Sequence, residues 1–345
     1  MPIFKEIQAL LAKKTPFVCY VKPNENKWNL LIQNNDEVIP FSGKSGFVFA
    51  PFDKGLKVVI PADEAVLSQG ILEEIKVNQS IKSDFLVTNQ KEAFEQLVTN
   101  GIQAIINGDF EKVVLSRKIE ISKEITIIET FQNLIASYPT AFRYLFFHPK
   151  VGIWLGATPE QLVKISDNRF ETMALAGTQL YSEDVVWETK EIEEQQFVTD
   201  YIVAKVKDKA NLVKVSEAKT SKAGNLAHLK SMISGELTND FQVLELIESL
   251  HPTPAVCGLP KKNAVDFIAK NEGYDRKYYT GFLGEFQMNN QTDLFVNLRC
   301  LEVESNATQI YVGCGITKDS IPEKEFIETE NKSMTMRNIL VFSAQ

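Results

Sequence analysis

Hydrophobic positions change their spacing several times along the chain, and each change predicts a different element. Short apolar runs separated by Pro, Gly, Asn and Asp fill residues 17 to 88, as in antiparallel strands. An amphipathic helix precedes them and ends before Pro16. The first apolar runs lie at 17–21, 30–32, 46–52 and 56–60. We therefore predict an N-terminal part that is rich in strands.

Later residues alternate between strand and helix patterns in longer blocks. A helix is predicted at 89–107, and residues 111–121 then form a strand with Lys112 and Val113 on opposite faces. A helix at 127–137 is followed by predicted strands at 142–148, 152–155, 162–166 and 170–175. We expect helices to dominate from 183 to 270, and strands to return at 281–288, 293–303 and 308–314 before a helix from 322. Such runs indicate an α+β fold.

A rigid loop interrupts the predicted helices at His251-Pro-Thr-Pro-Ala-Val-Cys-Gly. Proline fixes φ and restricts the preceding residue to extended geometry, so His251 and Thr253 have little conformational freedom. When such a loop stands alone, a stiff connection between two helices is the better explanation. Together with the residues described below, it predicts a loop that presents side chains to a small ligand.

Composition narrows the class of partner. The chain has 345 residues, a net charge of −8 and a pI near 5.2, which argue against nucleic acid or an anionic membrane as the main partner. Four scattered cysteines and three histidines suggest neither a disulfide framework nor a zinc site. With no signal peptide pattern and no long apolar run, the expected location is the cytoplasm.

Glutamates occupy positions on two predicted helices where apolar side chains are expected. In the helix at about 184–209, Glu191 and Glu194 fall on the apolar stripe, and Glu325 and Glu328 repeat the pattern in the C-terminal helix. A single Glu-x-x-Glu pair is typical of a solvated helix face. Two inward-facing pairs suit Mg²⁺, which prefers oxygen ligands and shares carboxylates with anionic substrates.

Eight short motifs occur together and in order between residue 90 and the C-terminus, and one of them is the helix with Glu191 and Glu194. The others are Lys-Val-Val-Leu-Ser-Arg at 112–117, Gly-Ala-Thr-Pro-Glu at 156–160, Leu-Ala-Gly-Thr at 175–178, His-Pro-Thr-Pro-Ala at 251–255, Arg-Cys at 299–300, Gly-Cys-Gly-Ile at 313–316 and Glu-Thr-x-x-Lys at 328–332. In these motifs the chain resembles the chorismate-utilising enzymes, and among them most the isochorismate synthases. Residues 1–88 match weakly, whereas 89–345 resemble the family core.

The resemblance implies one catalytic domain over residues 1–345, with two large antiparallel sheets packed together and helices outside. It implies that Glu194 and Glu328 bind Mg²⁺, with Glu191 and Glu325 as nearby or water-mediated partners. Substrate-binding roles are implied for Gly177, Thr178, His228, Ala255, Tyr279, Arg299, Gly313, Gly315 and Lys332. At Tyr279 the sequence departs from the family, because Thr280 replaces the usual first glycine of a Gly-Gly pair.

Three positions select the nucleophile within this family. Lys112 matches the lysine that activates water, Ala176 stands where aminodeoxychorismate synthases carry a nucleophilic lysine, and Ala255 replaces a threonine of the ammonia-using members. The resemblance thus implies that water adds at C2 of chorismate while protonated Glu160 donates to the departing C4 hydroxyl. Burial favours both the neutral lysine and the protonated acid that this chemistry requires.

Other readings stay open. A salicylate synthase forms isochorismate and then eliminates pyruvate in a similar site. Ammonia-using anthranilate or aminodeoxychorismate synthases and a regulatory subunit that binds chorismate without catalysis fit less well. We expect a monomer without a glutaminase subunit. Isochorismate serves menaquinone or siderophore biosynthesis, and no residue decides between them.

Overall fold

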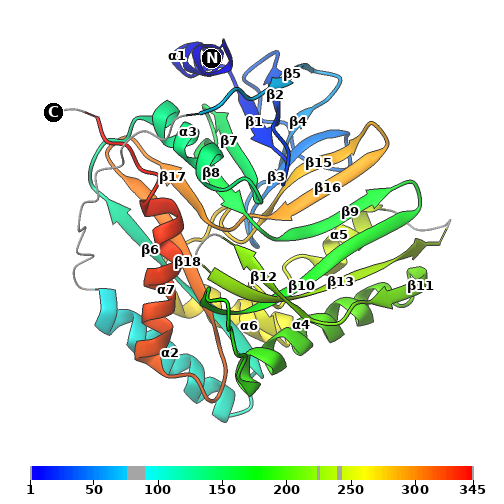
Figure 1. Ribbon diagram of the computed structural model, residues 1–345, viewed down its shortest axis with the longest axis vertical. Helices are drawn as coiled ribbons and strands as arrows, with labels where there is room; N and C mark the ends of the chain where they lie inside the picture. The colour runs from blue at the N-terminus through cyan, green and yellow to red at the C-terminus, as the bar shows by residue number, and fades with distance from the viewer. Residues whose placement is uncertain (1, 76–89, 224–225, 239–242, 344–345) are drawn as a thin grey trace.

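The computed structural model describes residues 2–75, 90–223, 226–238 and 243–343. Within these ranges two nine-stranded sheets, antiparallel in every pairing, pack together with helices on the outside (Figure 1). This architecture confirms the predicted α+β fold. The predicted strands at 76–88 lie outside the described residues.

The first sheet joins strands from both ends of the chain. Strand β18 pairs with β6 in a register that places Gly315 opposite Val114 and Gly313 opposite Ser116. Its strand order is β14 (Gly258–Leu259), β6 (Lys112–Ile121), β18 (Thr308–Ile316), β17 (Cys300–Val303), β8 (Gly152–Thr158), β7 (Phe142–His148), β1 (Phe17–Val21), β2 (Lys27–Gln33) and β5 (Ala65–Ile71).

The second sheet is built around the long pair β10 and β13, whose register shifts between Ala176 and Gln179. Its strand order is β11 (Ala210–Val215), β13 (Leu226–Leu237), β10 (Arg169–Leu180), β9 (Gln161–Ser166), β16 (Gln291–Val296), β15 (Phe282–Met288), β3 (Gly46–Ala50) and β4 (Val58–Pro61), and β12 (Lys219–Ala223) also pairs with β13. Strands β1 to β5 are thus divided between the two sheets.

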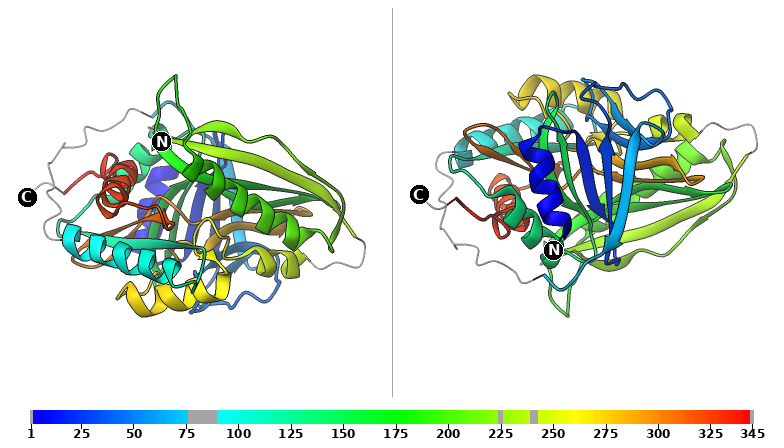
Figure 2. Two further views of the ribbon diagram at one scale, coloured as in Figure 1. Left: turned by 90° about the horizontal axis from the view of Figure 1, so that it is seen from below. Right: turned by 90° about the horizontal axis from the view of Figure 1, so that it is seen from above.

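Helices cover the outer faces of both sheets (Figures 1 and 2). They are α1 (Pro2–Ala12), α2 (Gln90–Ile106), α3 (Ile127–Ser137), α4 (Thr189–Val206), α5 (Val243–Leu250), α6 (Lys261–Asn271) and α7 (Pro322–Arg337). Helix α4 packs on β10 and β13, whereas α7 contacts β18 and α2. No helix in the described part of the chain is both long and apolar enough to cross a membrane.

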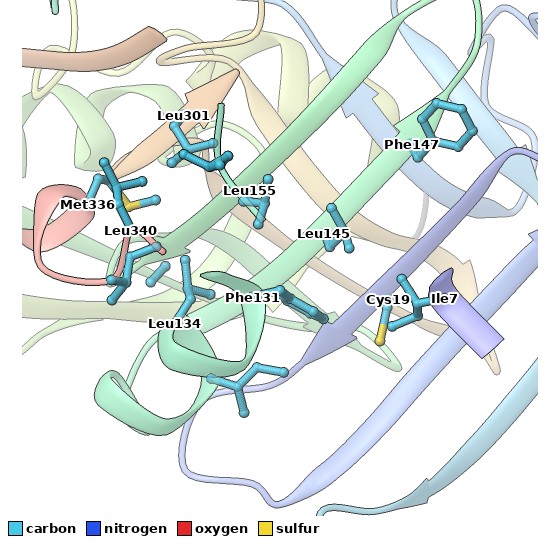
Figure 3. Close-up of a cluster of buried hydrophobic side chains, with 14 of the residues drawn as sticks. Ile7, Cys19, Phe131, Leu134, Leu145, Phe147, Leu155, Leu301, Met336 and Leu340 are labelled. Atoms are coloured by element: carbon cyan, nitrogen blue, oxygen red, sulfur yellow. The ribbon is translucent and has the colours of Figure 1, made fainter. Parts of the chain in front are cut away.

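Aromatic side chains fill the space between the sheets. Phe142 stacks on Phe295 of the other sheet with ring centroids 4.3 Å apart, and Trp154 stacks on Tyr311 at 5.4 Å. Outside the first sheet, Phe131 and Leu134 of α3 pack with Leu145 and other side chains, as Figure 3 shows. Burial of these large apolar surfaces is the main stabilising contribution to the fold.

Two sequence-based predictions are wrong. Helices do not dominate from 183 to 270, because β11, β12 and β13 occupy residues 210 to 237. Leu226, Leu229, Ile233 and Leu237 recur at three- and four-residue spacing, which also suits a helix, and long-range pairing with β10 makes this segment a strand. The predicted strand 293–303 is interrupted between β16 and β17.

Candidate active site

A cavity lies between the two sheets, at the end where α4 and α7 approach each other. About 660 Å³ of space, including its open mouth, is within the range typical of small-molecule sites. Its lining includes eleven of the residues predicted from sequence: Glu160, Gly177, Thr178, Glu194, His228, Ala255, Tyr279, Arg299, Gly313, Gly315 and Lys332. Residues from distant parts of the chain therefore converge on one site.

Lys112 begins β6 and is fully buried, unlike the solvated lysine that a strand end usually carries. Its Nζ lies 2.8 Å from Glu194 Oε1 on α4. Both side chains need the glycine at position 315, because a Cβ there would lie 2.4 Å from Glu194 Oε1 and 3.1 Å from Lys112 Cε. The close approach of β18 thus creates room for an ion pair at the edge of the cavity.

Glu160 follows β8 in the short turn before β9 and is buried. Its amide donates to Thr158 Oγ1 at 3.3 Å, and its carbonyl accepts from the Val296 amide at 2.9 Å, so the backbone is held on both sides. Burial raises the pKa of its carboxyl to about 8, against the opposing charges of Lys112, Lys332 and Arg299. Glu160 is therefore protonated at neutral pH, the state that a general acid requires.

His228 of β13 and Arg299 form a second polar pair. Burial, with help from Arg299 and Lys332, lowers the pKa of His228 to about 3, so the imidazole is neutral. Its Nδ1 donates to the Gly177 carbonyl at 2.9 Å, and its Nε2 accepts from Arg299 Nη2 at 3.3 Å, since guanidinium can only donate. Arg299 also donates to Thr335 Oγ1 at 3.4 Å. The guanidinium is thus held in a buried position beside the cavity.

The segment between β16 and β17 explains how Arg299 reaches the site. Arg299 has a φ of 47°, which is unusual for a residue other than glycine. At this residue the chain turns from β16 of the second sheet to β17 of the first. Thr280 has a similar φ of 60° and also lines the cavity. Strained backbone of this kind persists only where surrounding contacts maintain it, and active sites are one place where it occurs.

Tyr279 lies at the cavity wall despite the substitution of the neighbouring glycine by Thr280. Its ring stacks on Tyr311 with centroids 5.4 Å apart, and burial raises the pKa of its hydroxyl, which stays neutral. The departure from the family pattern therefore leaves the tyrosine in place. A Cβ at Gly313 would lie 3.0 Å from its hydroxyl oxygen, so glycine is the residue that fits there.

The proline-rich loop contributes less than predicted. Ala255 and Val256 line the cavity, whereas His251 Nε2 donates to the Pro51 and Phe52 carbonyls at 3.1 and 3.0 Å. Burial lowers the pKa of His251 to about 3, and the neutral ring packs against Phe282. The second half of the loop thus lines the cavity, while His251 holds the loop to the chain after β3 through hydrogen bonds.

Three ion pairs between lysine and glutamate border the site. Besides Lys112 and Glu194, Lys332 Nζ lies 2.7 Å from Glu328 Oε1 and donates to the Gly313 carbonyl at 3.0 Å. The third pair joins Lys190 of α4 to Glu325 of α7. An adjoining cavity shares Thr178 with the first and is lined by Glu191, Glu325 and Glu328. The predicted glutamates of both helices thus line two adjoining cavities.

These carboxylates fit the predicted Mg²⁺. Among the described residues no three His, Cys, Asp or Glu side chains are already grouped as a ligand set. Mg²⁺ does not need such a group, because it keeps several waters and is commonly held by one or two carboxylates together with an anionic substrate. Glu194 and Glu328, one from each helix, offer that donor set. Burial and then the charge of Glu328 raise the pKa of Glu325, so a cation near these glutamates would relieve their repulsion.

Tyr311 and Lys190 are among the residues near the site that were missed from the sequence. Tyr311 lies two residues before Gly313 in β18, so strand alternation gives the signal that both face the cavity. Lys190 directly precedes Glu191, but only the structure shows its pairing with Glu325 across two helices. A lysine at the start of a helix carries no local signal of such a contact.

Comparisons with known proteins agree with the site. A family model described as chorismate binding enzyme matches residues 60–341, more than half of the chain. The isochorismate synthase DhbC of Bacillus subtilis is 30% identical over 83% of this chain and 78% of its own length. Anthranilate synthase component 1 of Thermococcus kodakarensis is 26% identical over 84% of this chain and 67% of its own length.

Solved structures show the same fold. One from Bacillus anthracis, described as the 2,3-dihydroxybenzoate-specific isochorismate synthase DhbC, has a TM-score of 0.79 and 25% identity, with 96% of this chain and 98% of that chain covered. The menaquinone-specific isochorismate synthase MenF of Escherichia coli has a TM-score of 0.77 at 20% identity, with 94% and 88% covered. Together with the family model, these matches confirm the resemblance seen in the motifs: the chain belongs to the chorismate-binding enzymes.

Proposed function

We propose that the protein is a Mg²⁺-dependent isochorismate synthase, an isomerase that adds water at C2 of chorismate and removes the C4 hydroxyl. The observation that carries this proposal is that a fully buried lysine, Lys112, lies at the edge of the cavity and acts electrostatically on the buried carboxyl of Glu160 in the cavity lining, whose pKa burial raises to about 8. Because the relatives include both isochorismate synthases and anthranilate synthases, the nucleophile is the question to settle.

Binding of chorismate would rest on cationic groups and backbone. Arg299 and Lys332 place positive charges at the cavity to meet the two carboxylates of the substrate. Gly313 and Gly315 let the backbone of β18 approach the ligand closely, because neither position has room for a side chain. Mg²⁺ held by Glu194 and Glu328 would neutralise the ring carboxylate and so favour binding of the dianion.

The proposed reaction is a balanced substitution. In this scheme Lys112 acts as the free amine and takes a proton from water as the water oxygen bonds to C2, both ring double bonds shift, and the bond from C4 to its hydroxyl oxygen breaks. Glu160 gives its proton to that oxygen, which leaves as water. The composition of the substrate is unchanged, and the proton on Lys112 returns to Glu160 through solvent before the next turnover. His228 does not exchange protons in this scheme, because its neutral ring is occupied by Gly177 and Arg299.

Small residues near the cavity support water as nucleophile. Ala176 and Ala255 both line the site, and neither side chain offers an amine or a hydroxyl. In the family that the chain resembles, aminodeoxychorismate synthases carry their nucleophilic lysine at the position of Ala176. We infer that water is delivered by Lys112 and that the pocket holds no competing nucleophile at these two positions.

The cellular setting is also part of the proposal. We expect the enzyme to act in the cytoplasm as a monomer, without a glutaminase subunit, since water needs no ammonia supply. Its product would serve menaquinone or siderophore synthesis.

Product identity tests the proposal directly. Purified protein incubated with chorismate and Mg²⁺ should give isochorismate in a reversible mixture with chorismate, separated by chromatography, and added ammonium should not produce an aminated ring. Salicylate and pyruvate as main products would assign the chain to the salicylate synthases. Anthranilate or aminodeoxychorismate would overturn the role of Lys112, and chorismate binding without any product would leave a regulatory function. Full turnover in excess chelator would remove Mg²⁺ from the proposal.

A further inference from the structure

Lys190 is the one lysine of the three ion pairs that the proposed reaction does not use. It lies in the first turn of α4, and its Nζ is 2.6 Å from Glu325 Oε1 of α7. The side chain of Glu325 is only 2% exposed, and that of Lys190 is 26% exposed. Lys190 borders the adjoining cavity, together with Glu191 and Glu328, and it does not line the cavity proposed to bind chorismate.

Several carboxylates act on this lysine at once. Burial opposes its charge, but Glu325, Glu328 and Glu194 together raise the pKa of Lys190, so it remains an ammonium ion. These three glutamates include both proposed metal ligands. The ammonium therefore occupies the same electrostatic environment that a divalent cation would enter, and like charges at such separations repel strongly where water is partly excluded.

We propose that Lys190 is a built-in counter-cation that keeps Glu325 out of the metal's coordination and holds the affinity of the empty site for divalent cations low. This inference rests on the metal site of the proposed function. Two consequences follow from the charge balance. Removing the ammonium frees a buried carboxylate and removes a repulsion, so divalent cations should bind more tightly. Removing the carboxylate leaves an unpaired ammonium, so they should bind more weakly.

Four variants of the full-length protein separate these effects. Lys190→Met removes the charge at similar length, Lys190→Arg keeps it, Glu325→Gln removes the carboxylate, and the double variant removes both. Affinity for Mg²⁺ alone is measured by calorimetry, and affinity for Mn²⁺ alone by electron paramagnetic resonance, both without chorismate. Thermal unfolding establishes that each variant is folded. Since these measurements contain no turnover, they do not depend on which reaction the enzyme performs.

We expect Lys190→Met to tighten binding by at least about tenfold, because one repulsive charge is removed close to a divalent ion. Lys190→Arg should bind like the natural protein, Glu325→Gln should bind more weakly, and the double variant should return close to the natural affinity. Unchanged or weaker binding by folded Lys190→Met would overturn the inference, even if the natural protein binds Mg²⁺ well. Binding that is measurable only in Lys190→Met would support it. Absence of binding in both proteins would overturn the inference, whereas the metal site of the proposed function is tested separately, by Mg²⁺ binding in the presence of chorismate.

Discussion

Two buried clusters of charge connect the same pair of sheets, and they differ in what surrounds them. At the end away from α4 and α7, Lys22 Nζ lies 2.7 Å from Glu285 Oε2 and 3.2 Å from Asp293 Oδ2. Tyr20 donates to Glu285 Oε1 at 2.5 Å, and Gln161 donates to Asp293 Oδ1 at 2.7 Å. These polar groups satisfy one another. At the candidate site, by contrast, the ion pairs border a cavity, and Glu160 is kept neutral by burial.

The difference separates a structural use of charge from a functional one. Glu285 and Asp293 lie within strands, whereas Arg299 and Thr280 beside the cavity have positive φ angles. A cluster whose members pair fully with each other fixes how the two sheets pack together. A cluster that faces open space can exchange its protein partners for a ligand. The predictions below test this distinction, beginning with the largest expected effect.

Loss of Lys112 should have the largest effect on turnover. We expect Lys112→Ala to reduce kcat for isochorismate formation by about 10²–10⁴-fold, because a general base contributes that much to rate. Chorismate affinity should change little, since a general base acts in the transition state and contributes little to binding of the ground state. Steady-state kinetics with a fluorescence measure of chorismate binding would check this. Near-normal turnover would show that water is activated elsewhere.

Glu160 should control the pH dependence. The protonated carboxyl is the active form and its pKa is raised to about 8, so activity should be present below that pH and fall as pH rises through it. Glu160→Gln should reduce kcat by about 10²-fold or more and abolish this basic limb. The folded form binds the proton more tightly than the unfolded chain, so Glu160 stabilises the fold less as pH rises from 4.5 to about 8. The Glu160→Gln variant should therefore unfold at a higher temperature than the natural protein at alkaline pH.

Metal ligands should give an intermediate effect. Glu194→Gln and Glu328→Gln each remove a charged oxygen donor, so we expect Mg²⁺ affinity in the presence of chorismate to fall at least about tenfold. Raising the Mg²⁺ concentration should restore part of the activity of both variants, because the second carboxylate remains. Activity that no metal concentration restores would show that these glutamates serve another purpose.

The cluster of Lys22, Glu285 and Asp293 should respond in the opposite way, with a loss of stability and unchanged catalysis. Lys22→Met should leave two partly buried carboxylates without their cation and lower the free energy of unfolding by about 3 kcal/mol. Because Lys22 does not line the cavity, kcat and the chorismate KM of the folded fraction should remain near their natural values. Chemical denaturation and steady-state kinetics on the same sample measure both. A loss of rate without a loss of stability would contradict the distinction between the two clusters.

Local pattern was sufficient for many elements. The strand Phe142–His148 and the helix Ile127–Ser137 have the predicted bounds, because their apolar spacing fits one period only. It failed for β13, whose leucines fit a helix as well as a strand. It also could not locate the break before Arg299, since the turn there depends on a residue other than glycine at positive φ, which carries no sequence signature.

The residues of the candidate site were predicted from motifs, whereas their burial, ion pairs and protonation states depend on the fold. Strand alternation placed Lys112 on the face opposite Val113 and Leu115, but not in a buried ion pair with a helix far along the chain. The neutrality of Glu160 depends on burial that outweighs the opposing charges of Lys112, Lys332 and Arg299, and only the tertiary structure defines this balance. Likewise, Lys190 gained its partner from the packing of α4 near α7.

Backbone strain beside the cavity gives the smallest expected effect. Thr280 adopts a φ of 60°, which is unfavourable for a β-branched residue, and its Oγ1 accepts a hydrogen bond from Arg276 Nη1 at 3.3 Å. Thr280→Ala loses the hydroxyl but keeps a Cβ at positive φ, whereas Thr280→Gly loses the hydroxyl and relieves the strain. We expect the glycine variant to be more stable than the alanine variant by about 1 kcal/mol, measured by denaturant unfolding. Both should retain the stacking of Tyr279 on Tyr311 and hence most activity. An alanine variant as stable as the glycine variant would show that the backbone at Thr280 stores no strain. Backbone geometry would then not distinguish the residues at the cavity from the cluster of Lys22, Glu285 and Asp293.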